Sequence, residues 1–391
     1  MLAKRLDHLG FSEIRKVYEK VNAMQGSGKQ IFNLLLGEPD FPTPEPITET
    51  AIDSLRNGDT HYTSNFGLPE LRRILADKFI TENNIQASAN EILITSGASE
   101  AIFLSMMAVI NEGDDVLIPC PTWMNYASAC RLAGGNPVLV PLHGSNSEFS
   151  LDLEVLKQSM TPRTRMLVLT NPGNPTGVTY NREALMAICE LAMKHDWIVL
   201  ADEIYEKIVF DHWEHVSIAS LPGMKDRTIT VNGFSKAYAM TGWRVGYLYA
   251  SEQIMKGLVL VHQNNVTCLP VFSQKAAITA LLEANEDVIG MREQLKRRRD
   301  LVVRLLNQSE YFDVRPPKGA IYIFLDIKKT GKSSNEFSSG LLEESGVAVV
   351  PGTAFGPFGE GYVRLSIAAS EDVLQEACQR IAAYAVQSSL P

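Results

Sequence analysis

The 391-residue chain has few cysteines and no pattern that pairs them. The five cysteines are scattered, without a C-x-x-C motif, at Cys120, Cys130, Cys189, Cys268 and Cys378. Such scattering predicts free thiols in a reducing compartment and argues against a disulfide framework or a structural zinc site. His61 and His195 have no partner at metal-ligand spacing, so we expect no metal centre.

Long runs of one kind of residue are also missing. The net charge is −9, and the short RRR at Arg297–Arg299 is interpreted as a solvated helix face, so nucleic-acid binding is not expected. No run of about 18 uncharged apolar residues could cross a membrane. The first residues mix charges and lack the apolar core of a signal peptide. We therefore expect a cytoplasmic protein without membrane or nucleic-acid partners.

Two common phosphate-binding motifs are absent. No G-x-G-x-x-G follows a predicted strand, which disfavours a nicotinamide-dependent dehydrogenase. The segment TGKSS (Thr330–Ser334) resembles the end of a Walker loop, but Asp326 occupies the position of the first glycine of that motif. We therefore reject a Walker-type nucleotide site.

What the chain does contain is a repeated alternation of short apolar runs and amphipathic helical stretches. The candidate strands are Glu91–Thr95, Asp115–Pro119, Pro137–Pro141, Arg165–Thr170, Trp197–Asp202, Thr228–Asn232 and Val245–Ala250. Most are apolar throughout, as expected for a sheet that is covered on both faces. Helical patterns such as Glu100–Ile110 and Arg182–His195 lie between them. The alternation predicts an α/β fold with a mostly parallel seven-stranded sheet sandwiched by helices.

The pattern changes after about residue 271. A long helical region, Phe272–Asn307, precedes the apolar segments IYIFLDI, VAVVPG and YVRLSI, and a last helix begins near Glu371. This order predicts a smaller α+β domain, with which the N-terminal segment packs. A chain of this length exceeds one typical core. We expect a large cofactor-binding domain at residues 45–275 and a small domain formed by residues 1–44 with 276–391.

Polar residues stand where the predicted strands end, and ligands of a parallel sheet bind beyond these carboxyl ends. The stretch SGAS (Ser96–Ser99) opens a helix, whose exposed amides favour an anion, although an N-cap serine would by itself explain Ser96. The loop NPGNPTG (Asn171–Gly177) has a rigid backbone that aims its asparagine side chains. Trp123 in CPTW could stack on a flat ring or belong to the core.

Charged residues complete this set. Asp202 ends an apolar strand, where a buried carboxylate is unfavourable without a cation or a protonated nitrogen. Lys236 lies in a turn of small residues, and Arg244 follows eight residues later. Both cations could be solvated surface charges, but Asp202 would then have no partner. Pyridoxal 5′-phosphate offers a phosphate, a flat ring, a ring nitrogen and an aldehyde for these groups, with Lys236 as the Schiff-base lysine.

Over essentially its whole length the chain resembles the class I/II aminotransferases, the fold-type I pyridoxal phosphate enzymes, and within them the bacterial-type aspartate aminotransferase subgroup. The matching segments are LLGEPDFPTP (Leu35–Pro44), HYTSNFGLPELR (His61–Arg72), SGASEA, CPTW, NPGNPTG, ADEIY, FSKAYAMTGWRVGY, KGAIYIF and VRLSIAAS. They are specific as a set. The resemblance implies an enzyme that moves an amino group from an L-amino acid to a 2-oxo acid by a ping-pong mechanism through the Lys236 Schiff base.

The resemblance also implies roles for individual residues. The catalytic residues would be Lys236, which moves the proton, Asp202, which pairs with the ring nitrogen, and Tyr205. Cofactor contacts are implied for Gly97, Ala98, Ser99, Trp123, Asn174, Asp202, Tyr205, Ser235, Lys236, Arg244 and Tyr62. Substrate contacts are implied for Gly37, Trp123, Asn174 and Arg364. Arg364 would hold the α-carboxylate by a bidentate pair, and Tyr62 would reach a neighbouring subunit's phosphate, which implies a homodimer with shared active sites.

The chain departs from the family pattern at two positions. Gly233 stands where a serine is common, three residues before the lysine, so Ser235 is expected to contact the phosphate instead. Ser99 stands where aspartate-using relatives can have a lysine, which disfavours aspartate and glutamate as donors. Phe11 and Ile14 in the N-terminal segment would favour an apolar or neutral substrate side chain.

Two alternative functions remain at this point. A PLP-dependent lyase that catalyses C–S β-elimination or a related reaction would use the same residues, because the sequence does not show which α-carbon bond is perpendicular to the ring. A cofactor-binding regulatory module is the alternative from another class. The intact lysine and carboxylate-binding arginine argue against that module.

Overall fold

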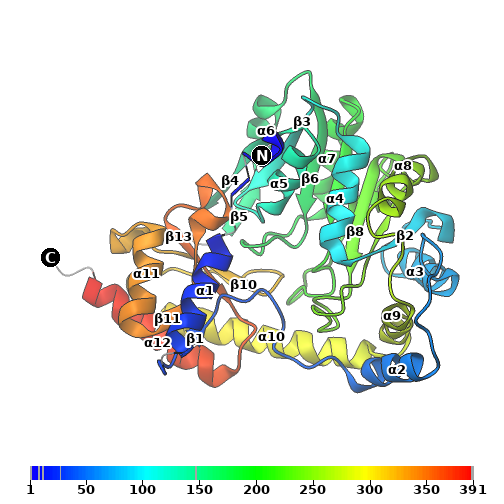
Figure 1. Ribbon diagram of the computed structural model, residues 1–391. Coiled ribbons are helices and arrows are strands. Elements are labelled where there is room, and N and C mark those ends of the chain that lie inside the picture. The colour runs from blue at the N-terminus through cyan, green and yellow to red at the C-terminus, as the bar shows by residue number, and fades with distance from the viewer. Residues whose placement is uncertain (1, 8, 11–12, 27, 146–147, 389–391) are drawn as a thin grey trace.

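A mixed sheet of eight strands forms the centre of the larger part of the molecule (Figure 1). This computed structural model describes residues 2–7, 9–10, 13–26, 28–145 and 148–388. The strands of the sheet, in spatial order, are β2 (Ile92–Thr95), β9 (Gly246–Tyr249), β8 (Thr228–Gly233), β7 (Ile198–Asp202), β6 (Thr164–Thr170), β3 (Asp115–Cys120), β4 (Asn136–Ser145) and β5 (Glu148–Leu151). The five strands from β8 to β4 are parallel, whereas β9 and β5 run antiparallel to their neighbours.

The α/β fold predicted from the sequence is confirmed, and each of the seven predicted strands is present. The eighth strand, β5, was not predicted. Its residues EFSL alternate between exposed and half-buried positions, so no continuous apolar run marks them.

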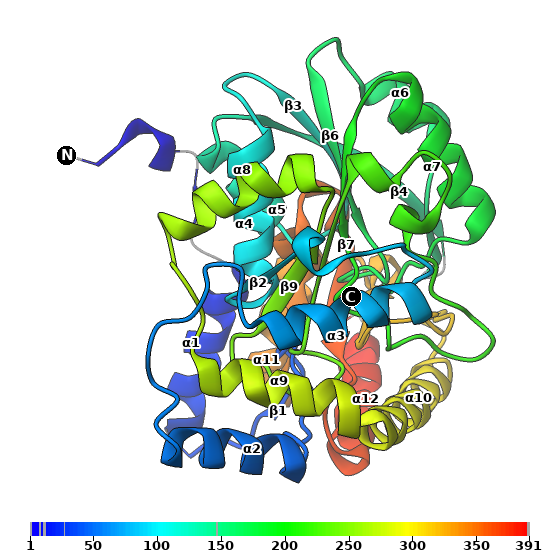
Figure 2. The same cartoon turned by 90° about the vertical axis from the view of Figure 1, so that its right-hand side faces the viewer.

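Helices cover both faces of the central sheet (Figure 2). Successive side chains of a strand point to opposite faces. In β3, Val116 and Ile118 belong to one apolar cluster, and Leu117 between them belongs to another. The first cluster includes residues of α4 (Gly97–Val109), α5 (Asn125–Leu132) and α8 (Glu252–Gln263). The opposite face packs against α6 (Leu153–Ser159) and α7 (Arg182–Lys194). Near β2 and β9, it packs against α3 (Pro69–Thr81) and α9 (Val271–Glu283). Helix α2 (Glu45–Arg56) packs on α9.

A second group of elements surrounds a small antiparallel sheet with the order β10-β13-β12. Its strands are β10 (Tyr322–Asp326), β12 (Val350–Pro351) and β13 (Tyr362–Ser366), and a two-stranded parallel sheet joins β1 (Phe32–Asn33) to β11 (Val347–Ala348). The helices of this group are α1 (Glu13–Gly26), α10 (Asn285–Leu306), α11 (Ser334–Ser345) and α12 (Glu371–Ser388). The N-terminal helix α1 contacts this group, because its Val21 shares an apolar cluster with Phe324 and Val350.

The long helix α10 extends from α9 to α12 along the lower side of the molecule in Figure 1. The predicted helical region Phe272–Asn307 is in fact two helices, α9 and α10, which meet at Ala284. The prediction of a solvated RRR face is wrong for two of the three arginines. Arg297 is exposed, but Arg298 and Arg299 are buried and form ion pairs.

In the part of the chain that the structure describes, no helix is both long and apolar enough to cross a membrane.

Candidate active site

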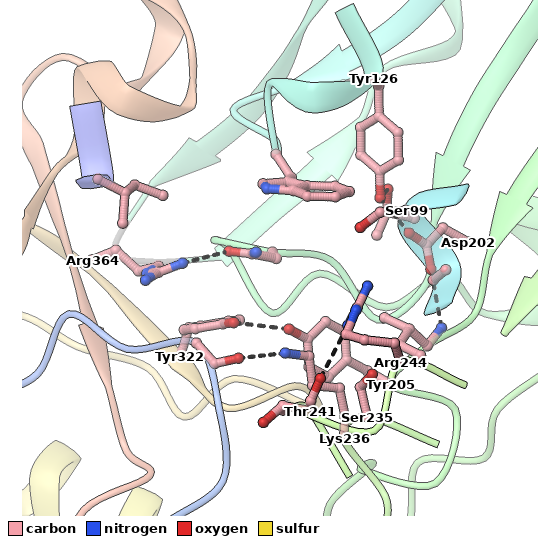
Figure 3. Close-up of a pocket in the computed structure, with 17 residues that line it drawn as sticks. Ser99, Tyr126, Asp202, Tyr205, Ser235, Lys236, Thr241, Arg244, Tyr322 and Arg364 are labelled. Atoms are coloured by element: carbon pink, nitrogen blue, oxygen red, sulfur yellow. Dashed lines mark hydrogen bonds between the residues drawn. The ribbon is translucent and has the colours of Figure 1, made fainter. Parts of the chain in front are cut away.

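A cavity of about 270 Å³ lies at the carboxyl ends of the parallel strands (Figure 3). Asp202 and Thr170 line it from the ends of β7 and β6, and Lys236 lines it from the turn after β8. Arg364 of β13 and Tyr322 of β10 face them from the small sheet. The cavity therefore lies where the two groups of elements meet.

The structure brings most of the predicted site residues together. The predicted residues that line the cavity are Gly37, Ala98, Ser99, Trp123, Asn174, Asp202, Tyr205, Ser235, Lys236, Arg244 and Arg364. Gly97 lies directly behind Arg244, outside the lining. Tyr62 does not line the cavity either, and it is 90% exposed. Ile14 is part of the lining, whereas Phe11 lies outside the described residues.

Lys236 points into the cavity from a turn of small residues. Its amine donates a short hydrogen bond to the carbonyl oxygen of Gly37, which belongs to the segment between β1 and α2. No carboxylate of the described residues lies within ion-pair distance of this amine. The amine is thus held by a neutral oxygen, which a ligand can replace.

Asp202 is a buried carboxylate that accepts hydrogen bonds but forms no ion pair among the described residues. The Tyr126 hydroxyl donates to Oδ2 at 2.6 Å, and the Ile204 amide donates to Oδ1 at 3.1 Å. Burial raises the pKa of Asp202 above its ordinary value, although the bonds from Tyr126 and Ile204 and the nearby charge of Lys236 oppose this shift. A protonated ring nitrogen would supply the positive charge that this carboxylate lacks.

Arg244 and the start of α4 form an open anion site. The Arg244 guanidinium donates to the carbonyl oxygens of Thr241 at 3.0 Å and Ser96 at 3.3 Å, and its backbone has a φ of 55°, which is uncommon outside glycine. Gly97 lets these groups approach, since an added Cβ would lie 2.5 Å from Nη2 of Arg244. The Ser96 side chain does not cap α4, contrary to the simplest interpretation of that serine. The first amides of α4 are therefore free to bind an anion.

Arg364 is a second cation without an anionic partner. It is 2% exposed, and it donates to the Leu35 carbonyl oxygen at 2.5 Å and to Oδ1 of Asn174 at 3.1 Å. Its Nε has no hydrogen-bond partner among the described residues. Burial lowers the pKa of this guanidinium. The guanidinium lies over the rings of Tyr322 and Phe355, 4.3 and 4.9 Å from the ring centres. A buried guanidinium with spare donors suits a ligand carboxylate.

Comparisons with known proteins agree with this geometry. Residues 29–381 match the sequence model of the family described as aminotransferase class I and II. The chain belongs to this family.

Its relatives include aminotransferases named for two different kinds of amino acid. The chain is 46% identical to an aspartate aminotransferase of Pyrococcus abyssi and 44% identical to an aromatic-amino-acid aminotransferase of Thermococcus litoralis, with 97% of each chain aligned. Among solved structures, aspartate aminotransferase from Thermus thermophilus with maleate superimposes with a TM-score of 0.93 at 36% identity, covering 98% of this chain and 99% of that one. The chain is therefore an aminotransferase of fold type I, a PLP-dependent enzyme that moves an amino group between an amino acid and a 2-oxo acid.

Sequence reasoning missed several residues of this aminotransferase that line the cavity. Tyr126 and Thr170 form a chain of hydrogen bonds to Asp202, with 3.1 Å between their oxygens. The Tyr322 hydroxyl lies 2.8 Å from that of Tyr205, and burial, with Tyr322 beside it, raises the pKa of Tyr205 well above the usual value. Tyr126 is the second residue of α5, three residues after Trp123, so its place just beyond the end of β3 was the signal that could have found it.

Replacing Tyr126 with phenylalanine is expected to lower kcat by about tenfold, since a hydrogen bond to a charged group contributes about 1.5–3 kcal/mol. The loss of this bond also raises the pKa of Asp202 further, so the acidic limb of the kcat/KM profile should move to higher pH. The pH profile of purified Tyr126→Phe measures both effects. Tyr249→Phe is the matched control, because the Tyr249 hydroxyl is buried without a hydrogen-bond partner among the described residues. Equal profiles for the two variants would reject the role of Tyr126.

A second buried cluster of charges lies beyond the cavity of this aminotransferase. The Lys78 amine lies 2.5 Å from Glu206, and His215 lies 3.1 Å from Glu203. Burial by itself would raise the pKa of Glu206, but Lys78, His215 and Asn83 together outweigh it and lower the pKa to about 2. Burial would likewise lower the pKa of His215, but Glu203 and Glu206 together outweigh it and raise the pKa. The carboxylate and histidine atoms lie close enough to hold a metal, yet Lys78 already supplies a cation there, so we interpret the cluster as an ion-pair network.

The change Glu206→Gln should reduce the free energy of unfolding by about 3–5 kcal/mol at neutral pH, because it leaves Lys78 without its closest anion. A carboxylate with a lowered folded-state pKa stabilises the protein above its unfolded pKa of about 4.3. That contribution disappears as the pH falls towards about 2. Urea unfolding should therefore give a difference from the parent that shrinks below pH 4. The exposed Glu190→Gln should remain within about 0.5 kcal/mol of the parent, and a similar result for Glu206→Gln would refute the network.

Proposed function

We propose that this aminotransferase binds pyridoxal 5′-phosphate in the cavity and uses Lys236 to transfer amino groups. One observation carries the proposal: Lys236, Arg244 and Arg364 surround the cavity without salt bridges among the described residues, opposite one buried carboxylate. Two anionic groups and one protonated nitrogen on a ligand would balance this set. A cofactor phosphate, a substrate carboxylate and a pyridine ring supply these groups.

Each part of the cofactor has residues that fit it. The amides of Ala98 and Ser99, the Ser235 hydroxyl and Arg244 would hold the phosphate, with Gly97 leaving room for Arg244. Asp202 would pair with the ring nitrogen. The remaining ring contacts would come from Trp123, Asn174 and Tyr205.

The bound cofactor would supply an electron-withdrawing ring that acidifies the α-C–H of the amino acid. The Asp202 carboxylate keeps the proton on the ring nitrogen, and this proton strengthens that withdrawal. Lys236 Nζ would remove the proton from the α-carbon of the amino acid and deliver it to the cofactor carbon that keeps the amino group. Arg364 holds the α-carboxylate, and Asn174 orients the guanidinium through its 3.1 Å hydrogen bond. Tyr205 and Tyr322 form a buried hydroxyl pair beside the reacting groups.

Borohydride reduction of the cofactor-loaded protein, followed by peptide mapping, tests this placement. The cofactor mass should appear on the peptide that contains Lys236 and on no other lysine. A label on a different lysine would contradict the assignment. The label is independent of turnover, so it separates cofactor placement from the reaction that follows.

We further propose that the preferred donors have apolar or aromatic side chains. Among the lining residues that the structure describes, the cations besides Arg364 are Lys236 and Arg244, which have other roles here, and Ile14 adds an apolar side chain. One relative is named for aspartate and another for aromatic amino acids, so both classes belong in the assay. A kcat/KM for phenylalanine or leucine above that for aspartate is expected, and the reverse order would reject this donor class.

We propose a homodimer in which Tyr62 completes the site of the neighbouring subunit. Tyr62 is almost fully exposed and lies outside its own cavity, which supports a contact to a second copy. Mixing Tyr62→Phe subunits with Lys236→Ala subunits places one intact site in each mixed dimer. Activity should therefore rise above that of either variant alone. A mixture without such recovery would mean that Tyr62 does not act across the interface.

We also propose the division into a large domain at residues 45–275 and a small domain of residues 1–44 with 276–391. The central sheet lies within the first range and the small antiparallel sheet within the second. Limited proteolysis should cut first near these boundaries, and early cleavage inside the central sheet would contradict the division.

A cytoplasmic location fits the free thiols of all five cysteines, and disulfides in the protein purified from its source would argue against it.

A further inference from the structure

The segment that leads from β1 to α2 touches both cations assigned to the reaction. We call Leu34–Thr43 the strap; it is part of the blue chain between β1 and α2 in Figure 1. The Leu35 carbonyl oxygen accepts from Arg364 and the Gly37 carbonyl oxygen accepts from Lys236. Gly37 also approaches Tyr322 so closely that an added Cβ would collide with the Tyr322 hydroxyl. The position of the strap backbone therefore sets the surroundings of both cations.

Arg298 of α10 holds the strap by an ion pair with Asp40. Its two terminal nitrogens donate to the two carboxylate oxygens of Asp40 at 2.6 and 3.1 Å, which is a bidentate geometry. The Arg298 side chain is only 8% exposed, and its guanidinium lies over the ring of Phe41, 4.8 Å from the ring centre. Such a pair is more rigid than an exposed salt bridge.

The neighbours of Arg298 on α10 do not share this function. Arg297 is exposed, and Arg299 pairs with Asp211 and Asp300. Arg298 is therefore the member of the RRR run that reaches the strap. A substitution at the exposed Arg297 is therefore a matched control for a substitution at Arg298.

Because of the sequence of the strap, a displacement of the Asp40 backbone should also displace the backbone of Gly37. Pro39 lies between these residues, and a proline fixes its own φ and restricts the residue before it. Glu38 and Pro39 therefore absorb little of a displacement. The strap has further contacts at Glu38, whose carboxylate accepts an exposed hydrogen bond from the Thr241 hydroxyl at 2.9 Å, and at its two ends, where Leu34 pairs with Ala348 and Thr43 donates to Ala239.

We propose that Arg298 is a positioning residue, which holds the strap through Asp40 and so fixes the Leu35 carbonyl group that orients Arg364. This inference rests on the proposed function of Arg364. A loose strap would leave Arg364 less well oriented for a substrate carboxylate. Among the described residues, no hydrogen bond or ion pair joins Ser99, Ser235 or Arg244 of the proposed phosphate site to the Arg298–Asp40 pair, so cofactor binding should be preserved.

Steady-state kinetics of Arg298→Gln, Asp40→Asn and the double variant test the proposal. Each single variant should raise KM for the amino acid and for the 2-oxo acid by about tenfold. The value of kcat should change by less than about threefold, and the absorbance of bound cofactor should be unchanged. The double variant should be no worse than either single variant, Arg298→Lys should recover part of the loss, and Arg297→Gln should match the parent. Parental KM values for Asp40→Asn, or additive effects in the double variant, would overturn the proposal.

Hydrogen exchange of the strap amides, measured without substrate, provides a readout that needs no activity. Exchange across residues 35–41 should be faster in Arg298→Gln and Asp40→Asn than in the parent or Arg297→Gln. Because the Asp40 side chain is partly exposed, Asp40→Asn should remain folded even if Arg298→Gln does not. Faster exchange with unchanged KM would overturn the positioning role and leave the proposed function intact. If the parent itself showed no transamination, the proposed function would fail, and unchanged exchange in both variants would separately refute the anchoring of the strap.

Discussion

Replacing Lys236 with alanine is expected to lower kcat by on the order of 10⁴-fold or more. The Lys236 amine enters the cavity and is held by the Gly37 carbonyl oxygen rather than by a carboxylate, so no other group competes for its covalent role. The same amine is positioned to move the α-proton, and its loss removes both contributions together. Steady-state turnover of the cofactor-saturated variant measures this effect.

The control variants for Lys236 separate charge from chemistry. Lys236→Arg keeps a cation near Gly37 but cannot bond covalently to the cofactor, so its activity should be nearly as low as that of the alanine variant. Lys194→Ala removes an exposed lysine at the end of α7 and should retain parental turnover. Retention of more than about a tenth of the parental kcat by Lys236→Ala would contradict the assignment.

The change Arg364→Met is expected to lower kcat/KM by about 10²–10⁴-fold, because a bidentate carboxylate contact contributes two charge-assisted hydrogen bonds of about 1.5–3 kcal/mol each. Most of the loss should appear in KM for both substrates, since the proposed role of Arg364 is to bind the carboxylate that ground state and transition state share. Kinetics with a donor amino acid and with a 2-oxo acid measure this effect. Arg304→Met, an exposed site on α10, is the control and should match the parent.

The same variant should have the opposite effect on stability. In the ligand-free protein the buried Arg364 guanidinium faces two neutral oxygens and no carboxylate among the described residues. Replacing an uncompensated buried charge by an apolar side chain is usually neutral or stabilising. Urea unfolding of Arg364→Met without ligands should give a free energy of unfolding at least as high as that of the parent. A large loss of stability would mean that the guanidinium is structural, and a kcat/KM within about threefold of the parent would mean that it does not bind substrate.

The sequence was sufficient to predict seven of the eight strands of the central sheet because both composition and position mark these seven. Apolar runs such as RMLVLT and TITVN are mostly buried, and residues that line the cavity follow each run within a few positions. The resemblance to known aminotransferases then connected Arg364, which lies far along the chain, to the same site. Local pattern alone could not have paired Arg364 with Lys236, since their proximity depends on how β13 faces the large sheet.

The features that sequence reasoning missed depend on tertiary packing. Tyr126 and Tyr322 acquire their roles only because the folded chain brings their hydroxyls to Asp202 and Tyr205. Arg298 and Arg299 are part of a charged run that is typical of a solvated helix, yet α10 packs against the strap and against the loop that carries Asp211. β5 has no apolar run, so its pairing with β4 depends on its partner rather than on its own sequence.

The most direct test of the central claim is a single half-reaction. Cofactor-loaded protein is mixed with one amino acid and no 2-oxo acid, and 2-oxo acid, ammonia and cofactor absorbance are followed together. Transamination through Lys236 predicts about one equivalent of 2-oxo acid per site, no ammonia, and an absorbance change that an added 2-oxo acid reverses. Continued release of ammonia with unchanged cofactor absorbance would contradict the account, because it would mean that the same cavity catalyses elimination.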